Sequence, residues 1–288
     1  MFEIITDSSA NLSNSMVKEL GIRVIPLTFF LGEEEHSSFH EDKEFDFAGF
    51  YDKLRKKEHV KTSLVNAERF EKIYEEALMA GKDVLAINIS SGISGTYQAS
   101  KIAADAVRER YPDRQVIVID SLAASIGQGL LVYYAAKMRE EGKTIEETAD
   151  WVYKNRLKLV HQFTVDDLFF LKRGGRLSGG VAIIGTVLQI KPVLHVDNEG
   201  HLIAQEKVKG RKKSLNRMVE MMEEKIENPE DQVLAICHGD CIDDAEYVAK
   251  KVREKYNVKD IIINVLDPVI GAHSGPGTVA LFYLGNER

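Results

Sequence analysis

The sequence has few of the features that mark disulfide-stapled, membrane-spanning or nucleic-acid-binding proteins. Two cysteines in 288 residues are too few for a disulfide framework. The apolar runs are far shorter than a membrane span, and the first residues carry neither a basic segment nor a long apolar stretch. A net charge of −7 argues against general nucleic-acid binding. We therefore expect a cytoplasmic protein with no secretory signal, no stable membrane insertion and no nucleic-acid partner.

What the chain does have is enough length for about two domains, and 44% hydrophobic residues to fill their cores. In the first half, short apolar runs alternate with helical patterns, which favours a parallel, doubly wound sheet. The second half has shorter strand patterns, and Asp197-Asn198-Glu199-Gly200 is typical of a hairpin turn. We predict an α/β protein with an N-terminal domain over residues 1–155 and a C-terminal α/β domain with a mixed sheet over residues 156–288. The polar stretch 32–46 is expected to be a solvated loop.

The most informative segment is a serine-rich turn over residues 90–100. An apolar strand pattern (84–89) precedes it and a helical pattern (97–107) follows, and ligands of open α/β sheets bind at such strand-to-helix turns. The turn before the helix offers the hydroxyls of Ser90, Ser91, Ser94 and Thr96. It also holds Gly92 and Gly95, and glycine lets the backbone approach a ligand closely. Free amides at a helix N-terminus favour an anion, so the turn predicts a carboxylate or phosphate site. The alternative is a run of ordinary helix-capping residues.

Several other motifs fail on inspection. Gly142-Lys143-Thr144 resembles the end of a P-loop, but Lys137 stands where the first glycine is required. A nucleophile elbow would need glycine at Thr96. His36 and His40 lie in a polar stretch that lacks the other ligands of a metal site. We expect no metal and no cofactor.

Motifs spread along the whole chain resemble the DegV family of bacterial fatty-acid-binding proteins. They are Thr6-Asp7-Ser8-Ser9-Ala10, Lys61-Thr62-Ser63, Ser90-Ser91-Gly92-Ile93-Ser94-Gly95-Thr96-Tyr97, Asp120-Ser121, Leu171-Lys172-Arg173-Gly174-Gly175-Arg176-Leu177-Ser178, Ile190-Lys191-Pro192 and His273-Ser274-Gly275-Pro276-Gly277. Each motif alone is weak, whereas their common order is specific. Two departures stand out: Leu64-Val65-Asn66 replaces the Gln-Pro-Ser that often follows Thr-Ser in the family, and Ser9 stands where threonine is often found.

The resemblance implies a two-domain α/β protein that holds one long-chain fatty acid, such as palmitate, between its domains. It places the carboxylate on the hydroxyls of Thr62 and Ser94, with Ser91, Gly95 and His273 close by. It also implies a carrier and not an enzyme. Some relatives present the carboxylate to a separate dihydroxyacetone-kinase-like fatty acid kinase, which uses ATP to form an acyl phosphate.

The basic residues Arg173, Arg176 and Arg211 would suit the acyl phosphate or an acidic partner face. The alternative for Arg176 is an exposed arginine in a plain turn, and for Arg211 it is the solvated start of a helix. The alternative for His273, which we expect in a glycine-rich loop, is a structural role.

A second function class stays open. A serine-dependent acyl hydrolase would use Ser94 or Ser91 with His273 and Asp7. Asp7 and Asp120 are as well explained as caps of the helices that follow them.

Overall fold

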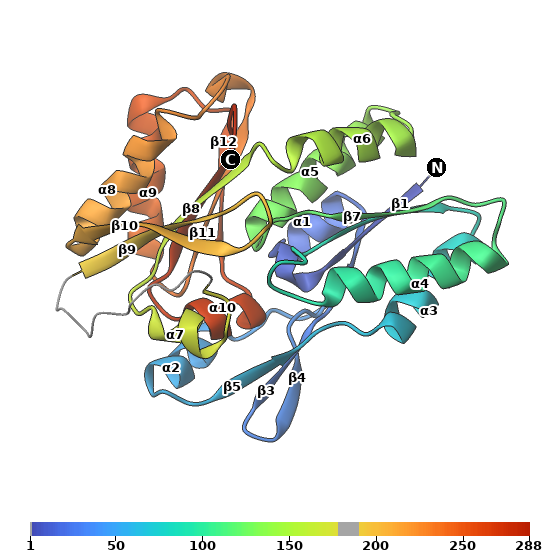
Figure 1. Ribbon diagram of the computed structural model, residues 1–288, viewed down its shortest axis with the longest axis horizontal. Helices are drawn as coiled ribbons and strands as arrows, with labels where there is room; N and C mark the ends of the chain where they lie inside the picture. Colours follow the sequence, from blue (N-terminus) through green and yellow to red (C-terminus); the bar gives the residue numbers. More distant parts are fainter. Residues whose placement is uncertain (1, 178–189) are drawn as a thin grey trace. The chain divides into compact units, whose positions relative to one another are not determined.

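The computed structural model describes residues 2–177 and 190–288, and its contacts divide the chain into two compact units (Figure 1). Unit 1 comprises Met1–Phe45 and Lys61–Arg156, and unit 2 comprises Asp46–Val60 and Leu157–Arg288. Ser178, the last residue of one family motif, lies outside the described residues. None of the helices within the described ranges is long and apolar enough to cross a membrane.

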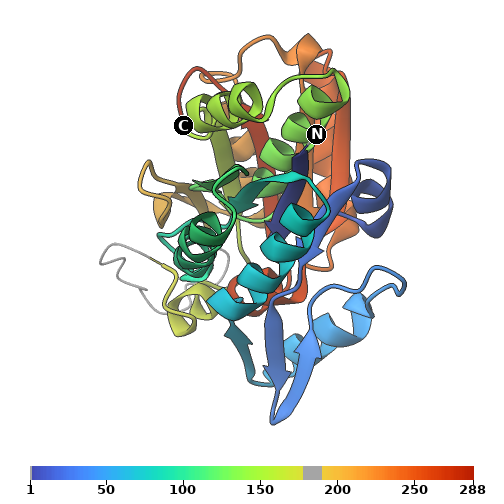
Figure 2. The ribbon, with the colours of Figure 1, turned by 90° about the vertical axis from the view of Figure 1, so that its right-hand side faces the viewer.

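A four-stranded parallel sheet of order β2-β1-β6-β7 forms the centre of unit 1, which confirms the predicted parallel sheet. The strand order reverses between β1 and β6, and this is the place where open α/β sheets bind ligands. Helices α3 and α4 cover one face, and α5 and α6 cover the other (Figures 1 and 2). The elements are β1 (Phe2–Asp7), η1 (Ser8–Ala10), α1 (Asn14–Glu19), β2 (Ile22–Ile25), α3 (Ala67–Met79), β6 (Asp83–Asn88), α4 (Thr96–Arg110), β7 (Val116–Asp120), α5 (Ile126–Glu140) and α6 (Ile145–Asn155).

The strands of this sheet are apolar on both faces because helices cover both. Ile4, Ile5, Leu85 and Ile87 have no exposed surface. Such continuous apolar runs are typical of buried parallel strands.

A small sheet of order β4-β3-β5 lies apart from the parallel one. It consists of β3 (Thr28–Leu31), β4 (Glu34–Ser37) and β5 (Val60–Ser63). The expectation of a solvated loop over residues 32–46 is therefore wrong for Glu34–Ser37, which pairs antiparallel with β3. The error has a simple cause: all four residues of Glu34–Ser37 are polar, so no apolar alternation marks this strand.

Unit 2 has a six-stranded mixed sheet of order β10-β9-β8-β13-β11-β12, as predicted for the C-terminal half. β11 and β12 run parallel, and the other neighbours run antiparallel. The predicted hairpin turn is confirmed, since Val196 pairs with Leu202 across it. The elements are α2 (Phe47–Arg55), β8 (Leu159–Thr164), α7 (Phe169–Arg173), β9 (Ile190–Val196), β10 (Leu202–Lys209), α8 (Arg211–Met222), η2 (Pro229–Asp231), β11 (Val233–His238), α9 (Ile242–Lys255), β12 (Asp260–Val265), α10 (Pro268–Ser274) and β13 (Val279–Leu284).

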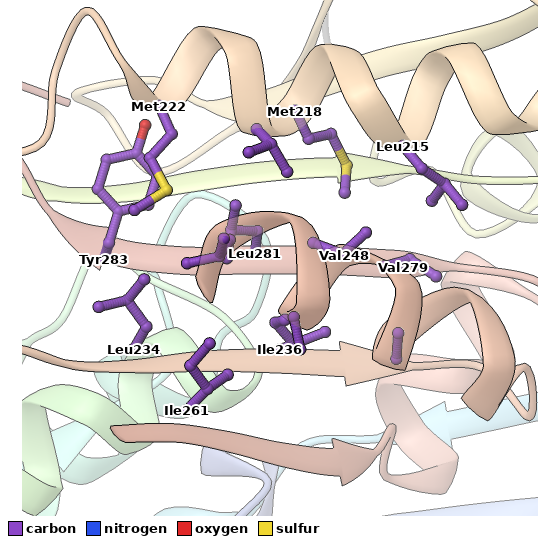
Figure 3. Close-up of a cluster of buried hydrophobic side chains, with 14 of the residues drawn as sticks. Leu215, Met218, Met222, Leu234, Ile236, Val248, Ile261, Val279, Leu281 and Tyr283 are labelled. Atoms are coloured by element: carbon purple, nitrogen blue, oxygen red, sulfur yellow. The ribbon is translucent and has the colours of Figure 1, made fainter. Parts of the chain in front are cut away.

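The core of unit 2 lies between this sheet and helices α8 and α9. Met218 and Met222 of α8 face Ile236 and Leu281 of the sheet, and all four are fully buried (Figure 3). Burying each such side chain contributes about 1.5–3 kcal/mol.

The segment Asp46–Val60, which contains α2, belongs to unit 2 although the chain before and after it belongs to unit 1. Its anchor is Tyr51, which has no exposed surface and donates a hydrogen bond of 3.1 Å to the carbonyl of Leu266. The sequence pattern of α2 shows an amphipathic helix, but not the sheet against which its apolar face packs.

Candidate functional site

The serine-rich turn connects β6 to α4 at the carboxyl edge of the parallel sheet. Ser90 organises it: this residue is fully buried, and its carbonyl accepts the amides of Ile93 at 3.2 Å and Ser94 at 3.1 Å. The Ser90 hydroxyl also accepts the amide of Gly92 at 3.1 Å. The backbone of the turn is therefore held by its own hydrogen bonds and presents the later hydroxyls in a defined position.

Ser94 is the half-buried hydroxyl at the helix end of this turn. Its Oγ accepts the backbone amide of Thr96 at 3.3 Å and lies 3.0 Å from the buried Thr96 hydroxyl. If the Thr96 hydroxyl donates to Ser94, the hydrogen of Ser94 is left for another acceptor. Sequence reasoning named Thr96 as one hydroxyl of the turn but did not assign it this supporting role.

Gly95 is the N-cap of α4 and supplies no side-chain cap. An added Cβ at Gly95 would lie 3.1 Å from Cδ2 of Leu64, which follows β5 directly. The end of β5 therefore lies beside the N-terminus of α4. The half-buried Thr62 on β5 and Ser94 in the turn thus belong to one neighbourhood of unit 1, where the helix end favours negative charge.

Asp120 holds the exposed side of the turn. Its Oδ1 accepts the amides of Ser91 at 3.1 Å and Leu122 at 3.0 Å. The side chain is largely buried, whereas Ser91 is exposed. Asp120 therefore fixes the backbone at Ser91. The capping alternative is wrong for this residue, because the N-cap of the following helix, α5, is Ser125.

Asp7 lies inside unit 1 and ties three elements together. Its carboxylate accepts hydrogen bonds from the amide and hydroxyl of Ser9, from the amide of Ile89 at 3.0 Å and from the side chains of Asn88 and Gln128 at 3.3 and 3.2 Å. Burial raises the pKa of Asp7, and these hydrogen bonds act in the opposite direction. Asp7 caps η1, as the sequence allowed, and links β1 to β6 and α5.

His273 belongs to unit 2, and the expectation of a loop there is wrong: it lies in the last turn of α10. The imidazole lies against the backbone of α7's C-terminal end, where an added Cβ at Gly174 would overlap Nδ1. Burial lowers the pKa of His273 to about 4, and the positive charges of Arg176 and Arg173 add to this shift. His273 is therefore neutral near pH 7.

The three predicted arginines have different surroundings. Arg176 donates to the carbonyl of Gly174 at 2.5 Å, and burial lowers its pKa. Arg173 lies over the rings of Phe169 and Phe170, with centroids 5.7 and 5.2 Å away. Arg211, at the start of α8, forms an ion pair of 2.8 Å with Asp244.

Within the two units, the predicted residues form two groups. Thr62, Ser91, Ser94 and Gly95 lie in unit 1: the last three precede α4 in the turn, and Thr62 lies two residues before Leu64, which is next to Gly95. A second group of Arg173, Arg176 and His273 lies in unit 2, around α7 and α10, while Arg211 stands at α8 with its acidic partner. Among the described residues, no group of three or more His, Cys, Asp or Glu side chains is placed to hold a metal ion.

Comparisons with known proteins agree with the family motifs. The family model described as "Uncharacterised protein, DegV family" matches residues 1–286. A DegV domain-containing protein from Clostridium perfringens is 46% identical over 287 residues, which cover 100% of this chain and 98% of the relative.

Two solved structures are similar over almost their full length. One is a DegV family protein from Thermus thermophilus whose structure is described as showing fatty acid binding; it has a TM-score of 0.89 and 30% identity to this chain, with 99% of each chain covered. The other is DegV from Bacillus subtilis, described as a fatty acid binding protein, with a TM-score of 0.84, 30% identity and 99% of each chain covered.

Proposed function

Since this chain belongs to the DegV family, we propose that it binds a long-chain fatty acid such as palmitate, with the carboxylate on the hydroxyls of Thr62 and Ser94. The full-length similarity to two proteins described as binding fatty acid supports the ligand class. The observation that carries the head-group assignment is the Ser94–Thr96 hydroxyl pair at the start of α4.

In this proposal the turn supplies neutral donors to a charged acceptor. Ser94 Oγ accepts the amide of Thr96, and we assign the Thr96 hydroxyl as a second donor to it, so that the Ser94 hydroxyl donates to the carboxylate. The Thr62 hydroxyl is a second donor to the carboxylate. The Gly95 backbone and Ser91 lie next to the head group. Hydrogen bonds to a charged group contribute about 1.5–3 kcal/mol each, and each buried methylene of the tail contributes about 0.8 kcal/mol.

We further propose that the protein is a carrier that presents the fatty acid to a separate ATP-dependent fatty acid kinase of the dihydroxyacetone-kinase type. Neutral His273 would hydrogen-bond the head group, and Arg173 and Arg176 would meet the acyl phosphate or the partner. Arg211 would join them only by giving up its ion pairs with Asp244 and Asp166, so it is the weakest candidate of the three.

Mass spectrometry of lipid released from the denatured, purified protein tests the ligand. We expect fatty acid of about the chain length of palmitate in stoichiometric amount. Thr62→Ala and Ser94→Ala should each weaken palmitate binding roughly 10- to 100-fold, as expected for a hydrogen bond to a charged group.

Ser63→Ala is the matched control. Ser63 is the exposed neighbour of Thr62 on β5, and its side chain points to the opposite face of the strand. Its loss should leave affinity unchanged. Wild-type affinity in the Thr62→Ala/Ser94→Ala double variant, or an empty protein that hydrolyses esters through Ser94, would contradict the proposal.

A further inference from the structure

Helix α2 packs on α10, the short helix that carries His273. The buried face of α2 consists of Phe50, Tyr51 and Leu54. Its far end is held by Arg55, which donates to the carbonyl of Asp240 at 3.1 Å and forms an ion pair of 2.6 Å with its carboxylate. α2 is therefore fixed on unit 2 at its middle and at its C-terminal end.

Tyr51 contacts the residue just before the cap of α10 and the backbone of the helix itself. Its hydroxyl donates to the carbonyl of Leu266, the residue before Asp267, which caps the helix. One turn later, an added Cβ at Gly271 would lie 2.5 Å from Oη and 3.0 Å from Cζ of Tyr51. The absence of a side chain at Gly271 is what lets the phenol lie directly against the α10 backbone.

The other end of α10 sets the imidazole. α10 spans seven residues, and a helix that short depends on packing for its position. His273 lies against Gly174, and Gly275, which ends the helix, lies so close to Phe170 that an added Cβ would be 2.5 Å from its Cδ2. A small displacement at the start of α10 would therefore move the imidazole out of this contact.

We propose that Tyr51 is a positioning residue for His273: its hydrogen bond and ring seat the start of α10 and so hold the imidazole against Gly174, beside Arg173 and Arg176. This inference rests on the proposed function, in which His273 meets the head group. Tyr51 acts only through the α10 backbone. Burial and the charge of Asp267 raise the pKa of Tyr51, so the phenol remains a hydrogen-bond donor throughout the physiological range.

The test follows the imidazole of His273 directly, by NMR titration of the ligand-free full chain, with the signal assigned by its loss in His273→Gln. In Tyr51→Phe we expect the signal to move and its pKa to rise from about 4 by roughly one unit, because a loosened α10 lets water reach the ring. The control is Tyr247→Phe, which also removes a tyrosine hydrogen bond in unit 2, the 2.7 Å bond to Asn216. It should leave His273 unchanged.

A merely structural Tyr51 would behave differently. In that case Tyr51→Phe would have a lower melting temperature, but its His273 would titrate as in the wild type. This result would overturn the proposal. Gly271→Ala gives a second route, because its methyl would press on the Tyr51 hydroxyl. We expect Gly271→Ala to shift the His273 signal. In the Tyr51→Phe/Gly271→Ala double variant, which lacks the hydroxyl that the methyl would press on, the His273 signal should be shifted less from its wild-type position than in Gly271→Ala. Additive shifts in the double variant would also overturn the proposal.

Adding palmitate to the same samples separates this inference from the function on which it rests. A His273 signal that depends on Tyr51 but ignores palmitate would remove the proposed role of His273 and leave the positioning intact. A signal that responds to palmitate but is unaffected by Tyr51→Phe would support the role of His273 at the head group and overturn its positioning by Tyr51.

Discussion

At the scale of single residues, the protonation of His273 decides what it can contribute. With a pKa of about 4, the imidazole is neutral at pH 7 and offers one donor and one acceptor. It can hydrogen-bond a carboxylate, but it brings no positive charge. In the proposed function, the positive charge for an acyl phosphate would come from Arg173 and Arg176, whose proximity helps to keep His273 neutral.

The same residue makes a prediction about acid stability. The pKa of His273 is lower in the folded protein than its ordinary 6.5, so the unfolded chain binds more protons between pH 6.5 and about 4. Acidification through this window therefore destabilises the fold, and His273→Gln removes that contribution. By calorimetry, the variant should lose about 2 kcal/mol less stability than the wild type between pH 7 and pH 4.5. Parallel declines in the two proteins would show that His273 is solvated.

At the scale of elements, the two adjacent glycines in the turn that ends α7, Gly174 and Gly175, are required for different reasons. Gly174 has ordinary backbone angles, but His273 occupies the space of a side chain. Gly175 has φ +68°, and the space around it is open. Glycine is needed at position 174 because a side chain would clash with His273. It is needed at position 175 because the backbone is left-handed there.

Alanine at each position should separate these demands. Gly174→Ala is expected to cost about 1–3 kcal/mol through overpacking and to displace the NMR signal of His273. Gly175→Ala should cost about 1–2 kcal/mol through left-handed backbone strain and leave that signal in place. Urea denaturation and the His273 spectrum check both expectations. An unmoved imidazole in Gly174→Ala would show that the turn, and not His273, gives way.

Asp7 joins β1, β6 and α5, and its replacement tests both the fold and the hydrolase alternative. In Asp7→Asn an amide NH₂ replaces one carboxylate oxygen and faces donors such as the Ile89 amide. We expect a loss of about 3 kcal/mol in stability, since buried donors lose their acceptor. Palmitate bound per folded molecule, measured by mass spectrometry, should not change. Loss of an ester-hydrolysis activity in this variant would instead favour a catalytic role for Asp7.

At the scale of the whole molecule, Arg176 should matter for the partner more than for the lipid. We expect Arg176→Glu to slow ATP-dependent acyl-phosphate formation by the cognate kinase about tenfold, because in the proposal the positive charges of Arg173 and Arg176 meet the partner or the phosphate. Bound fatty acid should stay nearly constant. Arg253→Glu, an exposed arginine of α9 in the same unit, changes the net charge equally and is the control. If fatty-acid occupancy in Arg176→Glu falls as much as turnover, the arginine belongs to the lipid site.

The sequence by itself determined the features that depend on local pattern. Buried runs predicted β6 and β7, a four-residue turn predicted the β9–β10 hairpin, and the order of short motifs identified the family. The helical form of α10 was also readable, because Asp267 and Pro268 are a capping residue and a first-turn proline, but the glycines around His273 obscured it.

Only the tertiary structure decided which distant parts of the chain meet. Tyr51 bonds to a carbonyl 215 residues away, Leu64 packs against Gly95, and His273 occupies the space beside Gly174. Residue types and spacing show that a helix has an apolar face or that a glycine is present, but not what fills the space opposite. Long-range packing settles that, because it is a property of the assembled core and not of any local segment.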